Sequence, residues 1–282
     1  MINLNGTLHN SPDNQLSLTN RGYQYGDALF ETIKVLPNKI LFWEDHYFRL
    51  MASMRILRME IPMHFTMEFL ESEILKTIQA NHLSNATARV RFNVNRVEGG
   101  KYAPESNHIH YNIIAEKLSD DLYQIKDIKD YTVDLYKDFF ITPGLLSTLK
   151  TNNKIINVLG SIYAQDNKLD NCLLLNTDKN VIEALNGNLF LVKDKVIKTP
   201  PLSDGCLKGI MRKQLLELIK TMDDYQLEEA SISSFELQKA DELFISNTIK
   251  GIQPIWTYRK KSFTMEVSKQ LVQKLNTKIR LS

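Results

Sequence analysis

The sequence predicts an α+β protein of two domains, and three observations lead to this prediction. The chain has 282 residues, which is above the size at which a single hydrophobic core usually divides. Hydrophobic residues make up 43% of the chain and charged residues 24%, as in ordinary globular proteins. Strand and helix patterns alternate up to a polar, charged stretch at residues 115–130, and then they start again. We therefore expect one domain at residues 1–118 and a second at residues 119–282.

The first half of the chain has the pattern of a sheet with two helices. Residues 1–9 predict a short strand and turn, and "DALFETIKVLPNKILFW" predicts two strands joined by a turn. Apolar residues recur at helical spacing in two segments and at alternate positions in two others. The predicted helices span residues 43–59 and 66–82, and the predicted strands span residues 86–96 and 108–117.

The second half mixes strands and helices in the same way. "YTVDLY" predicts a strand, and the strongly amphipathic "LKGIMRKQLLELIKTM" predicts a helix. Two more helices are expected at residues 153–169 and 266–279. Further strands are expected at residues 171–177, 189–200, 240–248 and 252–258.

Charge and composition exclude several classes of protein. The formal net charge is +2, and there is no basic tract interleaved with aromatic residues, so we expect no nucleic-acid partner. No apolar run approaches the roughly 20 residues that a membrane span needs, and the N-terminus lacks the pattern of a signal peptide. Cys172 and Cys206 are far apart, which is typical of a reducing compartment. We therefore expect a cytoplasmic protein with no membrane partner.

Three charged residues are candidates for chemistry, although each also has an ordinary structural interpretation. Lys150 in "LSTLKTNNKIINVLGS" is by itself one cation among 35 Lys and Arg residues. Arg49 follows His46 by three residues, so the two share a helix face, where a guanidinium would suit a phosphate. Glu183 ends an apolar run before "ALNGNLF", where it is either exposed at a turn or buried with a cationic partner.

Other stretches could bind an anion or line a site. In "NRGYQYGDALFETIKV", Tyr23 and Tyr25 would share one face if the run is extended, although a turn with an edge strand is the simpler interpretation. Gly209 stands at the start of a predicted helix, whose first amide groups suit an anion. The strand before "IKGIQPI" ends with hydroxyl and amide groups, those of Ser246, Asn247 and Thr248.

Taken together, these groups match the needs of pyridoxal phosphate. The aldehyde would take Lys150, and the protonated ring nitrogen would pair with Glu183. The phosphate would use Arg49, the amides after Gly209 and the hydroxyl of Thr248. Spacing alone does not establish this set.

Nearly the whole chain resembles the fold-type IV pyridoxal-phosphate enzymes, the class IV aminotransferase family. The resemblance rests on several blocks in the family's order, namely "NRGYQYGDALFETIKV", "HYFRL", "LKTNNKIINVL", "VIEALNGNLF", "TPPLSDGCLKGIMR" and "SNTIKGIQPI". It implies a two-domain fold like that of branched-chain aminotransferases. The N-terminal α/β domain would be the smaller one, and the C-terminal mixed, barrel-like domain would carry the Schiff-base lysine. It also implies a homodimer.

The resemblance assigns a role to individual residues. Lys150 matches the catalytic lysine, and Glu183 matches the partner of the pyridine nitrogen. Arg49 matches the phosphate arginine, and Tyr25 matches an active-site aromatic position. The rest of the phosphate cup corresponds to the backbone of Ile210 and Met211 and to the hydroxyl of Thr248, and two family asparagines correspond to Asn153 and Asn188.

The reaction is predicted from finer features. Branched-chain aminotransferases usually carry glycine where this chain has Thr32, and "RVEGGKY" and "KGIMR" look more like aminodeoxychorismate lyases. We therefore expect a lyase that converts 4-amino-4-deoxychorismate to 4-aminobenzoate and pyruvate, with an amino-acid aminotransferase as the alternative. The small-molecule amine substrate of the lyase has two carboxylates. Candidates to bind them are Arg89 and Arg91, on one strand face, and Lys101; surface ion pairs are an equally good interpretation of the two arginines.

Two other classes of function were weighed. A binding protein without catalysis would lack Lys150 or Glu183, and both are present. A metal enzyme could use His108 and His110, but no third ligand follows at a recognisable spacing, so we expect no metal.

Overall fold

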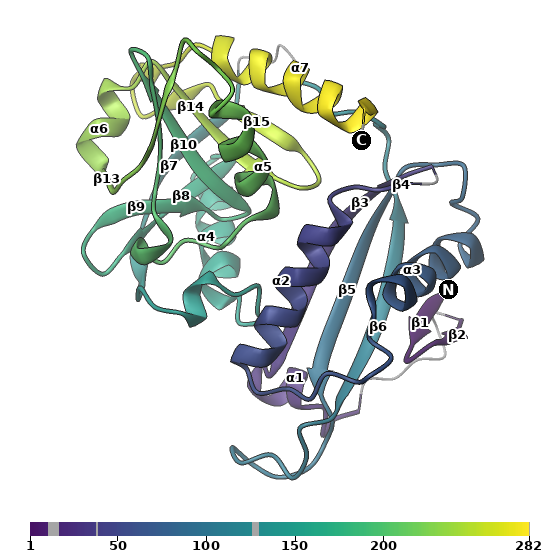
Figure 1. The fold of residues 1–282 in the computed structure, drawn as a ribbon. Coiled ribbons are helices and arrows are strands. Elements are labelled where there is room, and N and C mark those ends of the chain that lie inside the picture. Colours follow the sequence, from purple (N-terminus) through teal and green to yellow (C-terminus); the bar gives the residue numbers. More distant parts are fainter. Residues whose placement is uncertain (11–16, 38, 126–129, 282) are drawn as a thin grey trace. The chain divides into compact units, whose positions relative to one another are not determined.

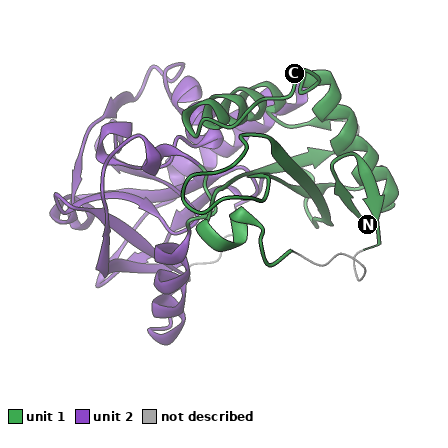
Figure 2. Cartoon of the chain, turned by 90° about the horizontal axis from the view of Figure 1, so that it is seen from below, with its two compact units in different colours: residues 1–121, 150–153 green, residues 122–149, 154–282 purple. Residues whose placement is uncertain are grey.

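A computed structural model describes residues 1–10, 17–37, 39–125 and 130–281 of the chain. The chain forms two compact units, coloured separately in Figure 2. The first unit comprises residues 1–121 together with residues 150–153, and the second comprises residues 122–149 and 154–282. The break after residue 121 falls inside the predicted linker, of which residues 126–129 lie outside the described ranges. Residues 150–153, expected in the second domain, differ from the prediction by belonging to the first unit.

The first unit contains one antiparallel sheet of six strands in the order β2-β1-β6-β5-β3-β4 (Figure 1). The predicted strand at the N-terminus is a pair of short strands that fold back on each other. The strands are β1 (Ile2–Leu4), β2 (Thr7–His9), β3 (Ala28–Leu36), β4 (Lys39–Ile40), β5 (Ala88–Arg96) and β6 (Ile109–Lys117).

Helices α2 (Trp43–Ile56) and α3 (Met67–Ala80) pack on this sheet, α2 against β3 and α3 against β6 and β1. Both helices confirm the periodicity seen in the sequence, and the hydroxyl of Thr66 caps α3 by accepting from the Phe69 amide at 3.2 Å. Residues of β5 alternate, with Val90 and Phe92 buried on the helix side and Arg91 half-buried on the opposite face. The sheet therefore has one face covered by helices and one face that carries polar side chains.

The stretch expected to form an edge strand before β3 is instead a short helix, α1 (Arg21–Tyr25). Asn20 begins it by accepting a hydrogen bond from the Tyr23 amide at 3.1 Å, and Gly26 ends it at φ +65°. Tyr23 and Tyr25 are therefore on different sides of a helix and do not share a strand face. The local capping residues decided the conformation, and they outweighed the strand-like alternation of the tyrosines.

The second unit is built on a mixed sheet of eleven strands, with the path β12-β11-β10-β9-β8-β7-β16-β17 and with β13, β14 and β15 paired to it on side branches. Its long strands are β7 (Thr132–Ile141), β8 (Asn171–Asn176), β9 (Asn180–Ala184), β10 (Gly187–Lys193), β14 (Glu242–Asn247) and β15 (Gly251–Ile255). Its short strands are β11 (Val196–Thr199), β12 (Gln226–Glu229), β13 (Ile232–Ser233), β16 (Thr257–Tyr258) and β17 (Lys261–Ser262). This mixed architecture agrees with the predicted fold class.

The helices of the second unit include the three that the sequence predicted. They are α4 (Ile155–Asp166), α5 (Ile210–Ile219), the short α6 (Ser234–Lys239) and α7 (Glu266–Leu281), with single 3-10 turns at Leu146–Thr148 and Leu202–Asp204. Along the described residues, no helix has both the length and the apolar content that are needed to cross a bilayer.

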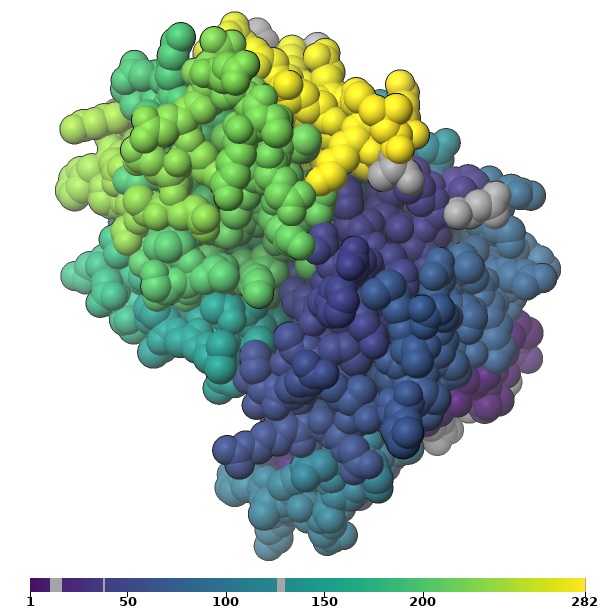
Figure 3. All heavy atoms as spheres, in the orientation of Figure 1, coloured from purple at the N-terminus to yellow at the C-terminus, as the bar shows by residue number. Residues whose placement is uncertain are grey.

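Helix α7 is anchored at its N-terminus by a buried carboxylate. Glu242, at the start of β14, accepts hydrogen bonds from the amides of Val267 at 2.9 Å and Ser268 at 2.7 Å, and from the Ser268 hydroxyl. The apolar side of α7 packs inward while its polar side belongs to the surface of the second unit (yellow in Figure 3). One side chain from a strand thus satisfies two of the amides that a helix start leaves unpaired.

We predict that Glu242→Gln lowers the free energy of unfolding by about 1–2 kcal/mol, because one accepting oxygen is replaced by an amide group that cannot accept. Urea unfolding followed by far-ultraviolet circular dichroism measures the effect. Glu266→Gln is the matched control, since Glu266 is an exposed acid in the same first turn, and it should cost less than about 0.5 kcal/mol. Equal effects of the two changes would show that Glu242 does not anchor the helix.

Candidate active site

Lys150 is held by backbone pairing to the sheet of the first unit. After the 3-10 turn at Leu146–Thr148, the chain runs antiparallel beside the start of β3. The amide of Phe30 donates to the Lys150 carbonyl at 2.9 Å, and the amide of Asn152 donates to the Ala28 carbonyl at 3.0 Å. The Lys150 amine lies 4.5 Å from the centre of the Phe30 ring. The predicted catalytic lysine is therefore positioned by an edge strand.

Arg91 contacts the same aromatic ring. Its guanidinium carbon lies 3.9 Å from the centre of the Phe30 ring, and its Nε donates to the Asn93 side chain at 2.9 Å. Thr32 is directly opposite Arg91 in the register of β3 and β5, so the two side chains share the polar face of the sheet. Burial, and to a smaller extent the charge of Arg89, lowers the pKa of Arg91. A half-buried cation of this kind would be stabilised by an anion.

Arg89 differs from Arg91 although both lie on the predicted face of β5. Its guanidinium forms an ion pair at 3.0 Å with Glu116 of β6, whose side chain is largely exposed. The two arginines therefore share a face, as predicted, but Arg91 contacts the ring beside Lys150 and Arg89 already has a carboxylate partner. Lys101, the third candidate, is exposed in the loop after β5.

On the helix side of the same sheet, Arg49 belongs to a buried polar cluster. Glu31 accepts from Arg49 Nε at 2.8 Å with one oxygen, and from Arg49 Nη2 and His46 Nδ1 with the other, the histidine contact being 2.7 Å. Burial alone would raise the pKa of Glu31, but the Arg49 charge and the hydrogen bonds from both partners lower this pKa to about 2. Burial lowers the pKa of His46, so we treat this histidine as neutral. The spacing of His46 and Arg49 predicts that they share a helix face, but it does not reveal Glu31.

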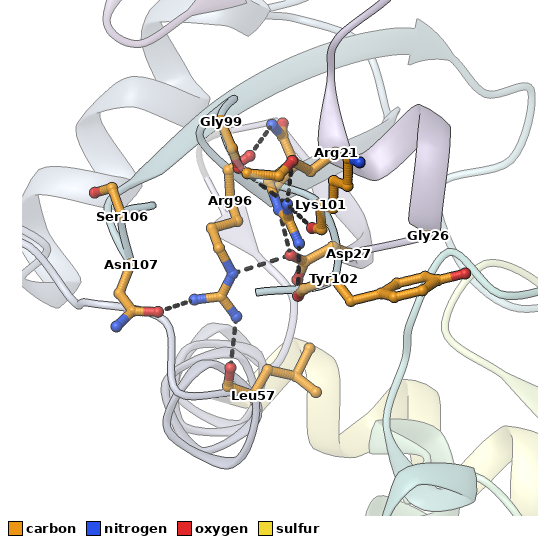
Figure 4. Close-up of polar contacts among 12 residues, drawn as sticks. Arg21, Gly26, Asp27, Leu57, Arg96, Gly99, Lys101, Tyr102, Ser106 and Asn107 are labelled. Carbon is orange, nitrogen blue, oxygen red and sulfur yellow. Dashed lines mark hydrogen bonds and ion pairs between the residues drawn. The ribbon is translucent and has the colours of Figure 1, made fainter. Parts of the chain in front are cut away.

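The loop that follows β5 is held by Arg21, which also contacts the carboxylate of Asp27 (Figure 4). The Asp27 carboxylate accepts from Arg21 Nε at 3.0 Å and from Arg96 Nε at 2.9 Å. Arg21 also donates to the backbone carbonyls of the loop, including that of Lys101 at 2.6 Å. The ring of Tyr25 lies 5.7 Å from that of Tyr102, which is exposed. The buried side chains of Arg21 and Arg96 therefore hold the shape of this loop, which carries the "GGKY" motif.

Glu183 and Asn188 lie in one polar row across the second unit's sheet. Glu183 of β9 pairs with Asn188 of β10, which pairs with Ser246 of β14, so the three side chains share a face. Glu183 accepts from the Leu207 amide at 2.8 Å, and the Asn188 side chain donates to the Leu207 carbonyl, also at 2.8 Å. Ser246 is buried, and its hydroxyl has no hydrogen-bond partner within the described residues. The sequence analysis named Ser246 as a strand-end hydroxyl but did not place it in the site.

The same row lies under the N-terminus of α5. Ile210 and Met211 are its first residues, and Gly209 precedes them without a side-chain cap. A Cβ at Gly209 would lie 2.0 Å from the Asn188 side-chain oxygen, so glycine is needed for this close approach. Unpaired amides at a helix start suit an anion. Thr248 follows β14, and its carbonyl accepts from the Tyr123 hydroxyl at 2.6 Å. These features fit the predicted anion cup.

Asn153, the remaining family asparagine, lies in the first unit against the end of α1. Its side-chain amide donates to the Gly26 carbonyl at 3.4 Å. A Cβ at Gly26 would lie 2.1 Å from the Asn153 side-chain oxygen, so this contact and the positive φ both require glycine.

The two histidines weighed as metal ligands contact different carboxylates. His108 lies 3.1 Å from Glu60, and His110 lies 3.5 Å from Glu98. Across the described ranges, no three His, Cys, Asp or Glu side chains are placed to hold one metal ion.

Comparison with known proteins adds a family and several relatives. The model of the family described as amino-transferase class IV matches residues 28–258. A Methanocaldococcus jannaschii protein, provisionally named a branched-chain-amino-acid aminotransferase, is 28% identical over 99% of this chain and 95% of its own length. The aminodeoxychorismate lyase of Vibrio harveyi is 26% identical over 86% of this chain and 88% of its own length.

Among solved structures, the 4-amino-4-deoxychorismate lyase from Pseudomonas aeruginosa is similar to this chain over 98% of both chains. The TM-score is 0.82 and the sequence identity is 25%. The branched-chain amino acid aminotransferase of Escherichia coli has the same fold, with a TM-score of 0.86 and 22% identity over 97% of this chain and 92% of that chain.

The buried cluster around Glu31 predicts a specific dependence of stability on pH. Because the folded pKa is lowered from 4.5 to about 2, the contribution of Glu31 is complete above pH 4.5 and is lost as the pH falls toward 2. The difference in unfolding free energy between the wild type and Glu31→Gln should therefore stay constant from pH 7 to about pH 5.5. Below pH 4.5 it should shrink by at most about 1.4 kcal/mol per pH unit.

Urea unfolding at a series of pH values measures this difference. Glu44→Gln is a control for general acid effects, because Glu44 is an exposed acid in the first turn of α2 and is not a partner of Glu31. A difference that remains constant down to pH 3 would contradict the assigned ionisation of Glu31.

Proposed function

The chain belongs to the class IV amino-transferase family, whose enzymes depend on pyridoxal phosphate, and on this premise we propose that it is a 4-amino-4-deoxychorismate lyase. Such an enzyme takes a small-molecule amine and releases 4-aminobenzoate and pyruvate. The relatives include both lyases and aminotransferases, so the choice between the two reactions depends on the residues beside Lys150.

Each unit, taken by itself, has residues that suit part of the cofactor. The first unit supplies Lys150 for the aldehyde and Arg49 for the phosphate. In the second unit, Glu183 suits the ring nitrogen, and Gly209 leaves the first amides of α5 accessible for the phosphate. The buried hydroxyl of Ser246, in the same row as Glu183, is a polar atom that still needs a partner. We assign the rest of the phosphate cup to Ile210, Met211 and Thr248, and a supporting role to Asn188.

The observation that carries the lyase proposal is the pairing of Lys150 and Arg91 on one ring. The Lys150 amine and the Arg91 guanidinium carbon lie 4.5 Å and 3.9 Å from the centre of the Phe30 ring. A substrate whose reacting carbon is close to Lys150 would therefore have a carboxylate within reach of Arg91. Thr32 adds a hydroxyl opposite Arg91, at the position where branched-chain aminotransferases usually carry glycine. This polar lining suits a dicarboxylate better than an aliphatic side chain.

The reaction requires proton transfers that these side chains can make. When bound, pyridoxal phosphate supplies an electron sink for the pair left behind when a C–H bond breaks. Glu183, oriented by the Leu207 amide, would hold a proton on the ring nitrogen. The Lys150 amine, in its neutral form, would accept the proton from the substrate's ring carbon. The bond between the ring carbon and the enolpyruvyl oxygen then breaks, the ring becomes aromatic, and the released three-carbon group takes up a proton on its methylene carbon to give pyruvate.

An aminotransferase acting on branched-chain or other amino acids is the second candidate. It is favoured by the similarity to the Methanocaldococcus jannaschii protein over nearly the whole chain. The same Lys150 and Glu183 would serve this reaction, but a 2-oxo acid would be needed to complete each cycle.

We also propose that the chain forms a homodimer. Helix α4 exposes an apolar stripe along one side, formed by Ile155, Val158 and Ile162. Leu145 and Leu146, in the preceding turn, are exposed as well. A group of exposed apolar side chains of this kind supports an interface between two copies of the chain. The cytoplasmic location and the cofactor-binding role of residues 119–282 stay predictions.

Lys150→Ala should abolish turnover, because no other amine takes its place. Reduction of the holoenzyme with borohydride should fix the cofactor on Lys150 in the wild type, as identified by mass spectrometry of peptides, and should fix none in the variant. Lys154→Ala is the matched control, since this neighbouring lysine starts α4. Cofactor fixed on residue 154, or still fixed in Lys150→Ala, would reject the assignment.

The lyase should release pyruvate and 4-aminobenzoate in equal amounts from 4-amino-4-deoxychorismate without any added 2-oxo acid. Chromatography of 4-aminobenzoate and a coupled pyruvate assay measure both products. Strict dependence on a 2-oxo acid, with no aromatic product, would reject the lyase and favour the aminotransferase.

The two arginines of β5 provide an internal control for this experiment. Arg91→Ala should raise the KM for the substrate roughly tenfold or more, because a charged hydrogen bond is worth about 1.5–3 kcal/mol. Arg89→Ala should change the KM little, since its guanidinium is paired with Glu116 near the surface. Equal increases in KM in the two variants would mean that Arg91 is no more important than Arg89 for binding the substrate.

A further inference from the structure

Glu31 is a buried carboxylate for which the reaction described above has no use. It is 2% exposed and lies on the helix side of β3, opposite the face that carries Phe30 and Thr32. Burying an ionised carboxylate is costly unless its partners compensate. The partners of Glu31 are two residues of α2, Arg49 and His46. The position of this carboxylate therefore bears directly on the proposed phosphate arginine.

The contact between Glu31 and Arg49 is two-pronged. One carboxylate oxygen accepts from Nε and the other from Nη2, so the carboxylate lies against one edge of the planar guanidinium. A guanidinium held in this way has a fixed plane and a fixed direction. The edge formed by Nη1 and Nη2 then points along a single direction, and it is the edge suited to a phosphate.

His46 holds the carboxylate from the other side. Its Nδ1 lies 2.7 Å from the oxygen that also accepts from Arg49 Nη2. An ionised carboxylate can only accept, so Nδ1 carries the proton, and in the neutral ring Nε2 is an acceptor. Nε2 is buried and has no hydrogen-bond partner among the described residues. His46 therefore restrains Glu31 without adding a charge to the cluster.

We propose that Glu31 is a positioning residue that fixes the guanidinium of Arg49 for the phosphate of the cofactor, an inference that rests on the proposed role of Arg49. Glu31 has two opposite effects on phosphate binding. Its negative charge offsets that of Arg49, which weakens binding, and its two-pronged contact orients the guanidinium, which strengthens binding. Orientation dominates, because a charged hydrogen bond needs its donor in place, and a guanidinium that loses its two-pronged contact can turn away. Removing the carboxylate therefore weakens cofactor binding.

Equilibrium dialysis of the full chain against pyridoxal phosphate, read by absorbance, gives the dissociation constant of each variant. Glu31→Gln should raise this constant about tenfold. Because Glu31 acts through Arg49, adding Glu31→Gln to Arg49→Ala should cause no further loss. Glu73→Gln is the matched control, since Glu73 is another buried carboxylate of the first unit and accepts from the Asn3 side chain at 2.7 Å. The Glu73→Gln variant should bind pyridoxal phosphate with the dissociation constant of the wild type.

An unchanged or lower dissociation constant in Glu31→Gln would overturn the inference while leaving the proposed function in place. Losses of cofactor affinity that add in the double variant would do the same. A wild-type chain that binds no pyridoxal phosphate would overturn the proposed function itself. If circular dichroism shows that Glu31→Gln is unfolded, Glu31→Asp becomes the test. It keeps the charge but shortens the side chain, so it should weaken binding several-fold, and wild-type affinity in that variant would overturn the inference.

Discussion

The backbone pairing between residues 150–152 and the start of β3 is the constraint on which the candidate chemistry depends. Two hydrogen bonds, at 2.9 Å and 3.0 Å, join a segment from the middle of the chain to a strand near its N-terminus. This bridge fixes the backbone at Lys150, and the Lys150 amine lies 4.5 Å from the centre of the Phe30 ring. Arg91 reaches the same ring from the next strand. The proposed catalytic amine and the cation proposed to bind the substrate thus both contact one ring of this sheet.

In the second unit, the corresponding constraint is the cross-strand register. Glu183 and Asn188 come from two successive strands and Ser246 from a strand much later in the chain, and the register aligns the three on one face. Asn188 contacts the loop before α5, and the close approach at Gly209 follows from that contact. Strand pairing therefore positions an acid and a buried hydroxyl, and the loop before α5 meets this row through Leu207.

Much of this architecture was predictable from the sequence. Helices α2, α3, α5 and α7 and strands β3, β5, β6 and β14 follow long periodic patterns, and their predictions are confirmed. Helix α1 was predicted wrongly, because the capping by Asn20 and Gly26 acts over five residues, too few for periodicity to show. Strands such as β13 and β17 have two residues each and leave no pattern at all.

The site residues divide in a similar way. Arg49 and His46 could be assigned to one helix face from their spacing. Glu31 could have been found from strand alternation, since it falls on the buried side of β3, but nothing in the sequence shows that β3 lies against that face of α2. Arg89 and Arg91 could be placed on one face but not distinguished, because the ion pair with Glu116 arises from the pairing of β5 with β6. Long-range register is the information that a single sequence lacks.

The loop after β5 shows how a surface segment can hold its shape while its side chains change. Arg21 recognises this loop through the carbonyls of residues 99–102, which every residue type possesses. The fold of the loop is therefore largely independent of the side chains at positions 101 and 102. Natural divergence or laboratory selection can exchange Lys101 and Tyr102 without unravelling the backbone that presents them. Because the buried arginine holds the backbone, the loop can keep its shape while the chemistry of its exposed side chains changes.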